Sequence, residues 1–495
     1  MRCFLFVLFA LIITPAAHTQ QLVMPGDHPD PSVVKIGDTY WASATTSNWF
    51  PAFPLMKSKD LLQWNTVGHV FKQLPAWADY YFWAPEISYE NGKVYVYYAA
   101  HKKNGNLCVG VASADKPEGP YKDHGPLMCE EAGSIDAFPM HDENGKLYLI
   151  WKEDGNSVGK PTPTWAQPMN EERTALTGEK KELFRNDVSW EGNLVEGVSM
   201  LRHGDYIYAF YAAAACCGRG CTYGSGVARA KNLLGPWEKY NRNPVIANSG
   251  QWKCPGHGTP VEKDGRYYFL YHAYDTITNV YTGRQGVLME FKFTPDGWVE
   301  FPDKHSVSKP HMPDIKDEFN AKNLSLNWQW SVFQDVKYEL KKGCLNLMAG
   351  ANNKTVYLGQ KTYSNHYDIV AAINTKRSDT EVGIGAIGDD ADQVNVLYGN
   401  DTIRVMMLKD NKETIVGKWP VSGRNENTLS LKMSVQNGKD ISFYYTYGTV
   451  YTMLNEIPVD GSFLPPWDRA VRAGLIVRGQ AGRKGVYEWF EMHNK

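Results

Sequence analysis

Three acidic residues occupy related places in a repeated sequence pattern. Asp30, Asp136 and Glu196 each precede a glycine-containing turn that leads into an apolar, aromatic strand. A protonated carboxyl and an ionised carboxylate can together cleave an acetal. The first donates a proton to the departing oxygen, and the second takes a proton from water on the opposite face of the sugar ring. A third acid close by raises the pKa of its neighbours, which keeps one of them protonated. The three acids therefore indicate hydrolysis of a glycosidic bond, provided that the fold brings them together.

A repeat along the first half of the chain supplies such a fold. The turn glycines recur about every 55 to 60 residues, at Gly37, Gly92, Gly145, Gly204 and Gly265. A period of this length, built from turns and strands, is typical of four-stranded propeller blades. The first strand of each blade lines the central axis, so equivalent positions converge there. The last repeat holds His257 at the equivalent position, whereas Glu86 lies too near its glycine to share the register.

The first twenty residues have the features of a secretory signal peptide. An arginine near the start precedes an apolar run, Cys3–Ile13, and small and polar residues follow it. The run is too short to span a bilayer, and no later stretch is long and apolar enough to do so. We therefore expect residues 1–20 to be a signal peptide, the protein to be exported to the periplasm or beyond the cell, and no membrane span.

We expect an all-β chain of two domains. Residues 21–302 hold the five repeats and are predicted to form a five-bladed β-propeller. Residues 303–316 are polar and proline-bearing, which is typical of a linker. Residues 317–495 show about a dozen short alternating segments, which favours a β-sandwich of jelly-roll type. Two roles stay open for that domain: covering the propeller and completing its pocket rim, or binding carbohydrate independently.

The composition narrows the class of partner. The formal net charge is −2 and the charged fraction is 21%, which argues against a nucleic-acid or membrane-surface partner, since both need a basic face. The aromatic content of 13% favours β structure and also suits stacking against sugar rings. We expect an oligo- or polysaccharide as the partner. The sequence does not indicate an oligomeric state.

Cysteines after the predicted signal peptide are odd in number, so at least one thiol must stay free. They are Cys108, Cys129, Cys216, Cys217, Cys221, Cys254 and Cys344. The run Cys216–Cys221, together with Cys254 one repeat later, is able to supply one or two disulfides that fasten loops at the predicted site. Spacing alone does not determine the pairing, and a zinc site is a weaker interpretation because no histidine is near.

The acid-bearing motifs resemble those of glycoside hydrolase family 43, the five-bladed propeller glycosidases, over the whole first half of the chain. Pro29-Asp30-Pro31-Ser32 is similar to the general-base motif of that family. Ser134-Ile135-Asp136 resembles the motif whose aspartate modulates pKa and positions substrate, and Val195-Glu196-Gly197 resembles the general-acid motif. The family more often has proline where this chain has Ala137 and Val198, which affects substrate identity rather than the acids.

The resemblance also implies supporting roles. Trp83, within Trp83-Ala84-Pro85-Glu86, is expected to form a wall of the pocket, and Arg284 is expected to contact the sugar. Phe138 and Phe50 are further candidates for substrate binding. His257 resembles the axial histidine beside which family members often hold a cation, so it is the candidate metal ligand. The chemistry itself requires no cofactor, although a structural calcium ion at the axis is possible.

These features together predict an inverting exo-glycosidase that acts on a terminal pentose of plant-type polysaccharides. The resemblance favours an α-L-arabinofuranosidase, with a β-xylosidase or another exo-acting, galactan-type glycosidase as alternatives. A non-catalytic sugar-binding protein on the same fold is the alternative from another class. It is disfavoured because binding alone has no use for an acid and a base on opposite faces of the sugar.

Overall fold

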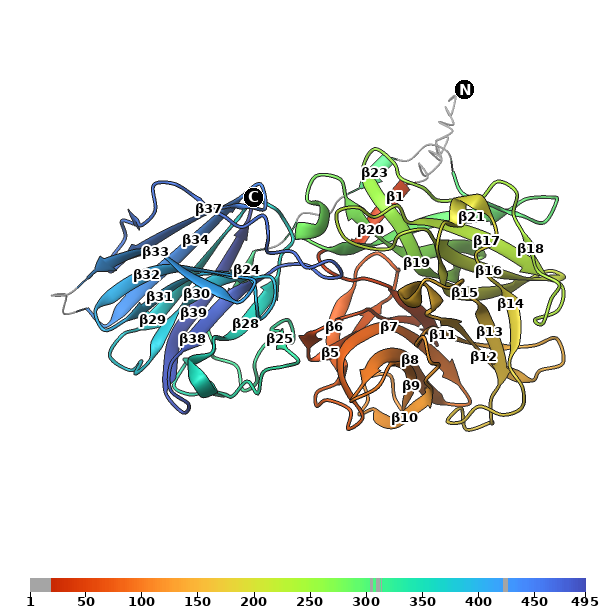
Figure 1. Cartoon of the computed structure of the whole chain (residues 1–495), viewed down its shortest axis with the longest axis horizontal. Helices are drawn as coiled ribbons and strands as arrows, with labels where there is room; N and C mark the ends of the chain where they lie inside the picture. The colour runs from red at the N-terminus through yellow and green to blue at the C-terminus, as the bar shows by residue number, and fades with distance from the viewer. Residues whose placement is uncertain (1–18, 303–305, 309–311, 313, 422–425) are drawn as a thin grey trace, which may run out of the picture.

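The computed structural model describes residues 19–302, 306–308, 312, 314–421 and 426–495. These residues form two β domains side by side, with no α-helix and only the short 3-10 turns η1 (Gly155–Val158), η2 (Ser189–Glu191), η3 (Asn279–Tyr281) and η4 (Ala351–Asn353) (Figure 1). Within the described residues, no helix is long and apolar enough to cross a membrane. Residues 1–18, most of the predicted signal peptide, lie outside the description, and the first strand begins at Thr19.

The first domain is built from five antiparallel sheets. Blade 1 holds β2 (Ser32–Ile36), β3 (Thr39–Ser43), β5 (Ala52–Ser58) and β6 (Asn65–Phe71). Blade 2 holds β7 (Ala78–Glu90), β8 (Lys93–Lys102), β9 (Leu107–Ala114) and β10 (Lys122–Met128). Blade 3 holds β11 (Ser134–His141), β12 (Leu147–Glu153), β13 (Thr164–Pro168) and β14 (Lys181–Phe184). Blade 4 holds β15 (Val195–His203), β16 (Tyr206–Ala213), β17 (Gly224–Ala230) and β18 (Glu238–Lys239). Blade 5 holds β19 (Trp252–Lys263), β20 (Arg266–Asp275), β21 (Arg284–Phe293), β22 (Val299–Glu300), β1 (Thr19–Met24) and β23 (Ser306–Ser308).

The two ends of the first domain close it into a ring. β1 pairs antiparallel with β21, so the first strand of the chain completes the last blade. The inner strands contact one another in the circular order β2, β7, β11, β15, β19 and back to β2. Five apolar clusters fill the five spaces between neighbouring blades, as Phe53, Phe71 and Phe82 do between blades 1 and 2. The predicted five-bladed propeller is therefore confirmed.

The inner strands share an irregularity at the place where the candidate site lies. The ladders of β7, β11, β15 and β19 shift register there, as β-bulges do. A left-handed residue marks the point in every blade: Asp30 (φ 50°), Ala84 (46°), Asp136 (57°), Gly197 (62°) and His257 (37°). Non-glycine residues rarely adopt this conformation and tend to do so at functional sites. At Gly197 a Cβ atom would lie 2.7 Å from Cγ of His257, so only glycine fits.

The second domain is the predicted β-sandwich. One sheet contains β24 (Ile315–Asp317), β26 (Tyr338–Leu340), β27 (Leu345–Met348), β29 (Tyr367–Asn374), β34 (Thr428–Gln436), β35 (Asp440–Thr446), β36 (Thr452–Met453), β37 (Val459–Asp460) and β39 (Lys484–Asn494). The other contains β28 (Val356–Lys361), β30 (Glu381–Ile387), β31 (Gln393–Gly399), β32 (Thr402–Lys409), β33 (Lys412–Pro420) and β38 (Arg472–Arg478). β34 shows the alternation most clearly, because every second side chain, Leu429 to Val435, enters the shared core.

Backbone pairing joins the two domains. β25 (Trp330–Ser331) of the second domain pairs with β4 (Trp49–Phe50) of the first. Trp49 is buried there, with its ring 5.9 Å from that of Tyr357 and beneath the guanidinium of Arg472. In addition, the loop 461–471 between β37 and β38 reaches from the sandwich onto the propeller (Figure 1). The second domain is therefore placed against the propeller at two separate points.

Candidate active site

Asp30 lies two residues before the start of β2, and its carboxylate is held by several segments. Thr45 Oγ1 donates to Asp30 Oδ2 at 2.6 Å, and Arg284 Nη1 donates to Asp30 Oδ1 at 3.0 Å. The backbone N–H of Asp30 donates to His272 Nδ1. Burial by itself would raise the pKa of Asp30, but the positive charge of Arg284 and the adjacent histidines outweigh it and hold this pKa well below its usual range. Asp30 is therefore an ionised carboxylate, as a general base must be.

Glu196 on β15 is paired with a buried lysine. Lys152 Nζ donates to Glu196 Oε2 at 2.6 Å and to Asp154 Oδ1 at 2.8 Å, and its side chain is 1% exposed. Tyr223 OH donates to Glu196 Oε1 at 2.9 Å. Burial opposes ionisation, yet the charge of Lys152 outweighs it, so the pKa of Glu196 is lowered. In the free site Glu196 is therefore ionised, although the sequence resemblance implies that it acts as the acid.

Asp136 on β11 lies between the other two acids and has no strong cation partner. Its Oδ2 accepts from the backbone N–H of Gly197 at 2.8 Å, and His257 Nδ1 lies 3.9 Å from the same oxygen. Burial raises the pKa of Asp136 to about 6, and the negative charges of Glu196 and Asp30 add to this, while His257 and Lys152 oppose it. Asp136 and Glu196 thus form an interacting pair that holds one proton below about pH 6, so either residue is able to carry it.

The three predicted acids are gathered at one place. His257 Nδ1 lies 3.5 Å from Asp30 Oδ1 as well as near Asp136, and Asp136 binds the backbone next to Glu196. One acid is ionised and a neighbouring pair holds a proton, which is the division of labour that acetal hydrolysis needs. Glu86 lies apart from these contacts. It accepts from Thr259 at 3.4 Å, and burial raises its pKa well above the usual value.

The other predicted substrate-binding residues divide into two groups. Arg284 and Trp83 lie at the site, whereas Phe138 and Phe50 do not. Phe138 packs in the apolar cluster between blades 3 and 4, because its side chain leaves β11 away from the axis. Phe50 belongs to the domain contact, where its ring lies 6.0 Å from that of Trp330.

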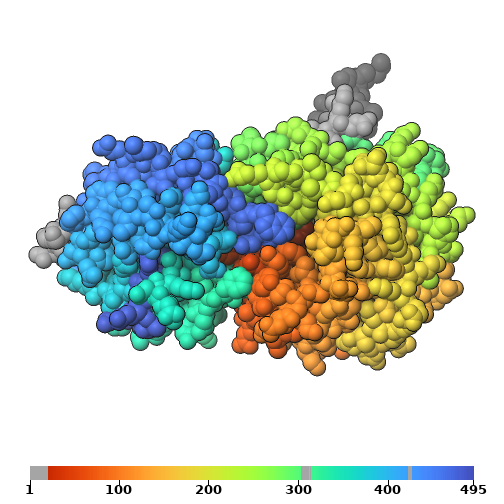
Figure 2. Space-filling model, viewed as in Figure 1, coloured from red at the N-terminus to blue at the C-terminus, as the bar shows by residue number. Residues whose placement is uncertain are grey.

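The second domain contributes to the rim of the site through loop 461–471. Trp467 meets Trp83 edge-on at 5.9 Å, and Trp83 Nε1 donates to Ser47 Oγ at 3.1 Å. Ser47 Oγ donates in turn to the carboxylate of Asp468, whose backbone oxygen accepts from Arg284 Nη2 at 3.1 Å. Figure 2 shows this part of the sandwich, in blue, lying against the propeller beside a hollow. The rim is therefore formed by both domains.

His257 is placed as a partner of the acids. Its Nδ1 faces Asp30 and Asp136, and Asp30 already accepts hydrogen bonds at both carboxylate oxygens. Among the described residues, no three or more histidine, cysteine, aspartate or glutamate side chains are arranged to hold a metal ion. A metal role for His257 stays a prediction, and no chemical step below depends on it.

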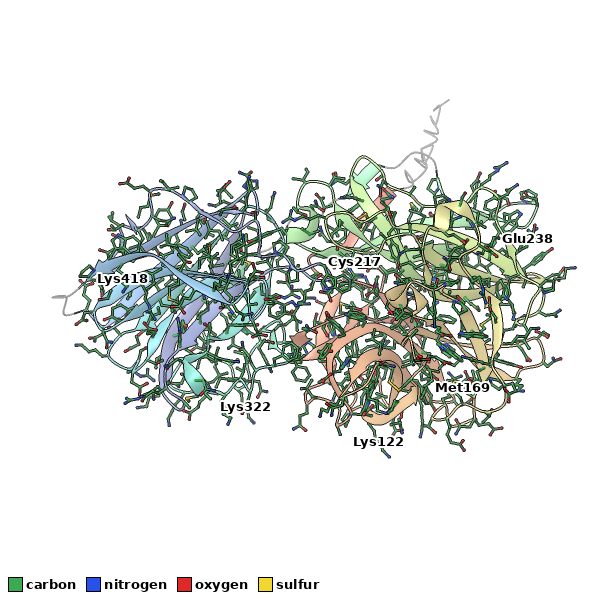
Figure 3. The ribbon with its side chains drawn as sticks, viewed as in Figure 1. Lys122, Met169, Cys217, Glu238, Lys322 and Lys418 are labelled. Carbon is green, nitrogen blue, oxygen red and sulfur yellow. A yellow bond between two sulfur atoms is a disulfide. The ribbon has the colours of Figure 1, made fainter. Side chains whose placement is uncertain are left out.

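The disulfides lie partly at the site. Cys221 and Cys254 join the loop after β16 to β19, and Cys216 is bonded to Cys217, which Figure 3 labels on the side of the propeller facing the sandwich. Arg284 Nη1 lies 3.8 Å from Cys216 Sγ. The remaining bridge, Cys108–Cys129, lies in blade 2, and Cys344 of the second domain is a free, buried thiol.

Several residues at the site escaped the sequence analysis. Lys152 is the charged residue that ends the apolar run of β12, and a buried lysine beside an acid-bearing strand was the available signal. His272 stacks on Tyr223 at 5.8 Å, and burial lowers its pKa to about 4, so it is neutral and accepts from the backbone of Asp30. Asp468 gave no signal, because it reaches the site from the other domain.

Comparison with known proteins now defines the class. Residues 19–299 match Glycosyl hydrolases family 43, and residues 316–466 match the β-xylosidase C-terminal concanavalin A-like domain. The first match covers more than half of the chain, so the protein belongs to glycoside hydrolase family 43, whose members hydrolyse with inversion.

Individual relatives are similar at a lower level. The chain is 25% identical over 446 residues to a non-reducing-end α-L-arabinofuranosidase of Bacteroides ovatus, covering 80% of this chain and 78% of that protein. It is 28% identical over 273 residues to a xylan 1,3-β-xylosidase of a Vibrio species, covering 51% of this chain and 49% of that protein. A xylan β-1,4-xylosidase from Bacillus halodurans shares the fold with a TM-score of 0.81 at 20% identity, covering 96% of this chain and 100% of that one.

Replacing Lys152 is expected to shift the pH dependence of the enzyme. Lys152 lowers the pKa of both Asp136 and Glu196, so in Lys152→Met the pair keeps its proton to higher pH. The basic limb of the kcat/KM profile should move upward by about one to three pH units. Lys239→Met is the control, since Lys239 also contacts two acids, Asp187 and Glu191, but in the outer part of blade 4. An unmoved basic limb in Lys152→Met would contradict this role.

Proposed function

We propose that the protein is an exo-acting enzyme that removes terminal pentose residues from plant-type polysaccharides. We favour α-L-arabinofuranosidase activity, with β-xylosidase activity as the second candidate and a galactan-type activity behind it. The observation that carries hydrolysis is the pairing of ionised Asp30 with a proton-holding Asp136–Glu196 pair at the propeller axis. The names of the Bacteroides and Vibrio relatives support a pentose, and the longer match supports arabinofuranose.

In the proposed reaction, Asp30 removes a proton from a water molecule that attacks the anomeric carbon. The bond from that carbon to the leaving oxygen breaks, and Glu196 gives this oxygen the proton that the Asp136–Glu196 pair holds. Arg284 keeps Asp30 ionised before the reaction, and Lys152 stabilises the carboxylate that Glu196 becomes when its proton leaves. Asp30 then releases the proton taken from water to the solvent, and the Asp136–Glu196 pair takes one up, which restores the starting state. Because water enters opposite the leaving group, the configuration at the anomeric carbon inverts.

The rim supports exo action. Loop 461–471 places Trp467 against Trp83 and Asp468 against Ser47, at one side of the acids. A rim closed on one side admits the end of a chain more readily than its middle. Trp467 is 54% exposed, so its ring is free to stack against the sugar that follows the scissile bond.

Two further proposals concern the setting of the enzyme. We propose that it is exported, because the apolar first segment is accompanied by disulfides such as Cys108–Cys129 and Cys221–Cys254, which persist in oxidising compartments. A structural calcium ion near His257 also stays a proposal. The surrounding carboxylates offer hard oxygen ligands of the type that calcium prefers, and water would have to complete the shell.

Changing either working acid is expected to abolish most turnover. Glu196→Gln and Asp30→Asn should each lower kcat/KM by about 10²- to 10⁴-fold, because they remove the proton donor and the base. The matched control is Glu86→Gln, because Glu86 is buried on an inner strand and makes none of the contacts that join the three acids, so this variant should stay near the wild-type rate. Circular dichroism would verify folding. A near-normal rate in Glu196→Gln or Asp30→Asn would remove that residue from the mechanism, whereas a wild-type protein that binds the sugar without turnover would favour a binding protein.

A panel of aryl glycosides tests the substrate. The kcat/KM value for an α-L-arabinofuranoside should exceed the values for a β-xyloside and a β-galactoside. Proton NMR of the first product should show inverted anomeric configuration. A higher value for the xyloside would replace the first candidate with the second, and retention of configuration would contradict the mechanism.

Trp467 tests the role of the second domain. In Trp467→Ala, kcat/KM for an arabino-oligosaccharide should fall about fivefold, since one stacked sugar contributes on the order of 1 kcal/mol. Activity on an aryl monoglycoside should change less. Tyr451→Ala, also part-exposed on the sandwich, is the control. Equal losses on both substrates would show that Trp467 acts by shaping the site rather than by holding the following sugar.

A further inference from the structure

A cavity of about 430 Å³ lies between the two domains, apart from the acids of the active site. The propeller contributes His28, His69 and Trp64 to its wall, and the sandwich contributes Lys361 and Tyr363. No aspartate or glutamate is among the described residues that line it. Buried polar groups need partners, so the hydrogen bonding of this wall decides what the cavity is able to hold.

Two imidazoles in the wall have incomplete hydrogen bonding. His28 is 8% exposed and His69 is 6% exposed, and within the described structure the Nδ1 atom of each has no partner. Burial, assisted by the charge of Lys361, lowers the pKa of His69 to about 3 and holds that of His28 well below its usual value. Both rings are therefore neutral, and a neutral imidazole carries one ring N–H that is able to donate a hydrogen bond to a ligand. Leaving such buried groups unpaired is costly.

Lys361, at the end of β28, brings a positive charge that no described acid neutralises by direct contact. The acid whose charge acts on it most is Asp27, and Asp27 already accepts from Arg472 Nη2 and from the backbone N–H of Ala470, both at 3.1 Å. Burial, with the charge of Arg472, lowers the pKa of Lys361 to about 7. An ammonium group in such surroundings is stabilised by an anion beside it.

We propose that this cavity binds an oxyanion whose oxygens accept hydrogen bonds from Lys361 Nζ and from the ring N–H groups of His28 and His69. A metal ion would be repelled by Lys361. The oxyanion is either a free inorganic ion or the carboxylate of a sugar acid. The volume of the cavity and the rings of Trp64 and Tyr363 leave space for the latter. Because its ligands come from both domains, the bound anion would also connect them.

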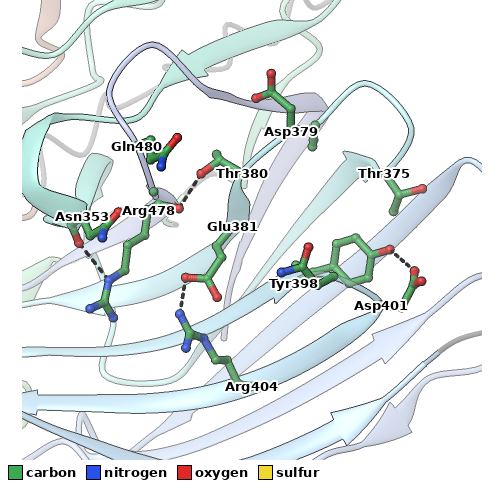
Figure 4. A pocket seen from close by; sticks show the side chains of 14 residues that line it. Asn353, Thr375, Asp379, Thr380, Glu381, Tyr398, Asp401, Arg404, Arg478 and Gln480 are labelled. Carbon is green, nitrogen blue, oxygen red and sulfur yellow. Dashed lines mark hydrogen bonds and ion pairs between the residues drawn. The ribbon is translucent and has the colours of Figure 1, made fainter.

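A second pocket differs from this cavity in how its charged groups are paired. It has a volume of about 540 Å³, lies wholly in the sandwich, and is more strongly charged (Figure 4). Its charges neutralise one another: Arg404 pairs with Glu381, and Arg478 Nη2 lies 2.8 Å from Glu413. Tyr398 donates to Asp401 at 3.1 Å. Because the charged groups there are paired, surplus positive charge distinguishes the cavity between the domains.

Thermal unfolding of the full chain tests the proposal. Sodium phosphate and sodium glucuronate form the two arms, and sodium chloride at the same ionic strength is the reference. A ligand that binds only the folded state raises the Tm in a saturable manner, so at least one arm should show this rise and chloride should not. A rise with phosphate alone identifies an inorganic ion, and a rise with glucuronate alone identifies a sugar acid. No saturable rise in either arm would overturn the proposal.

Variants locate the site. Lys361→Met should weaken binding of the active anion about tenfold or more, because it removes a charge-assisted hydrogen bond. Lys322→Met, which removes an exposed lysine of the same domain, should leave the Kd unchanged. His69→Phe provides a second variant if Lys361→Met does not fold, and it should also weaken binding. An unchanged Kd in the folded variants would overturn the assignment.

Discussion

The pairing of buried charges at the propeller axis is the constraint on which this structure depends. Carboxylates buried this deeply are costly unless cations accompany them. Arg284 forms an ion pair with Asp30, and Lys152 forms one with Glu196. Asp136 has only the more distant contact with His257. The three axial acids have only two close cations between them, and Lys152 also binds Asp154, so this shortage of positive charge decides where a proton is retained. Catalytic roles are thus set by the neighbours of the acids, because the acids themselves differ little in chemistry.

The same charges make the second domain part of the catalytic unit. Asp27, three residues before Asp30, accepts hydrogen bonds from Ala470 and Arg472, and Arg284 donates to the backbone of Asp468. The sandwich therefore supports both the segment that carries the base and the cation that keeps it ionised. The sequence left two roles open for the second domain, which were to cover the propeller and complete its pocket rim or to bind carbohydrate independently. These direct contacts support the first role. They also explain how a domain that carries none of the three axial acids is able to influence the chemistry.

Local signals predicted the ring and the acids well. Turn glycines and apolar inner strands indicate the blades directly. The rotational symmetry of the propeller then brings Asp30, Asp136 and Glu196 together. Features that depend on distant packing were not accessible. The left-handed backbone at Asp136 has no marker in its sequence, and the bulge there directs Phe138 into the core. Lys152 and Asp468 acquire their roles only from partners on other strands or in the other domain.

The closure of blade 5 has a consequence for how the chain reaches its native state. β1 must wait for β21, because the residues of β21 are synthesised after those of blades 1 to 4. Contacts that link distant parts of a chain form slowly, and an unpaired strand edge invites association with other molecules. Until that pairing forms, blade 5 has an open edge. The first four blades are thus free to form during synthesis. The axial acids are brought together around one site only after β1 has paired with β21 and the ring of blades is complete.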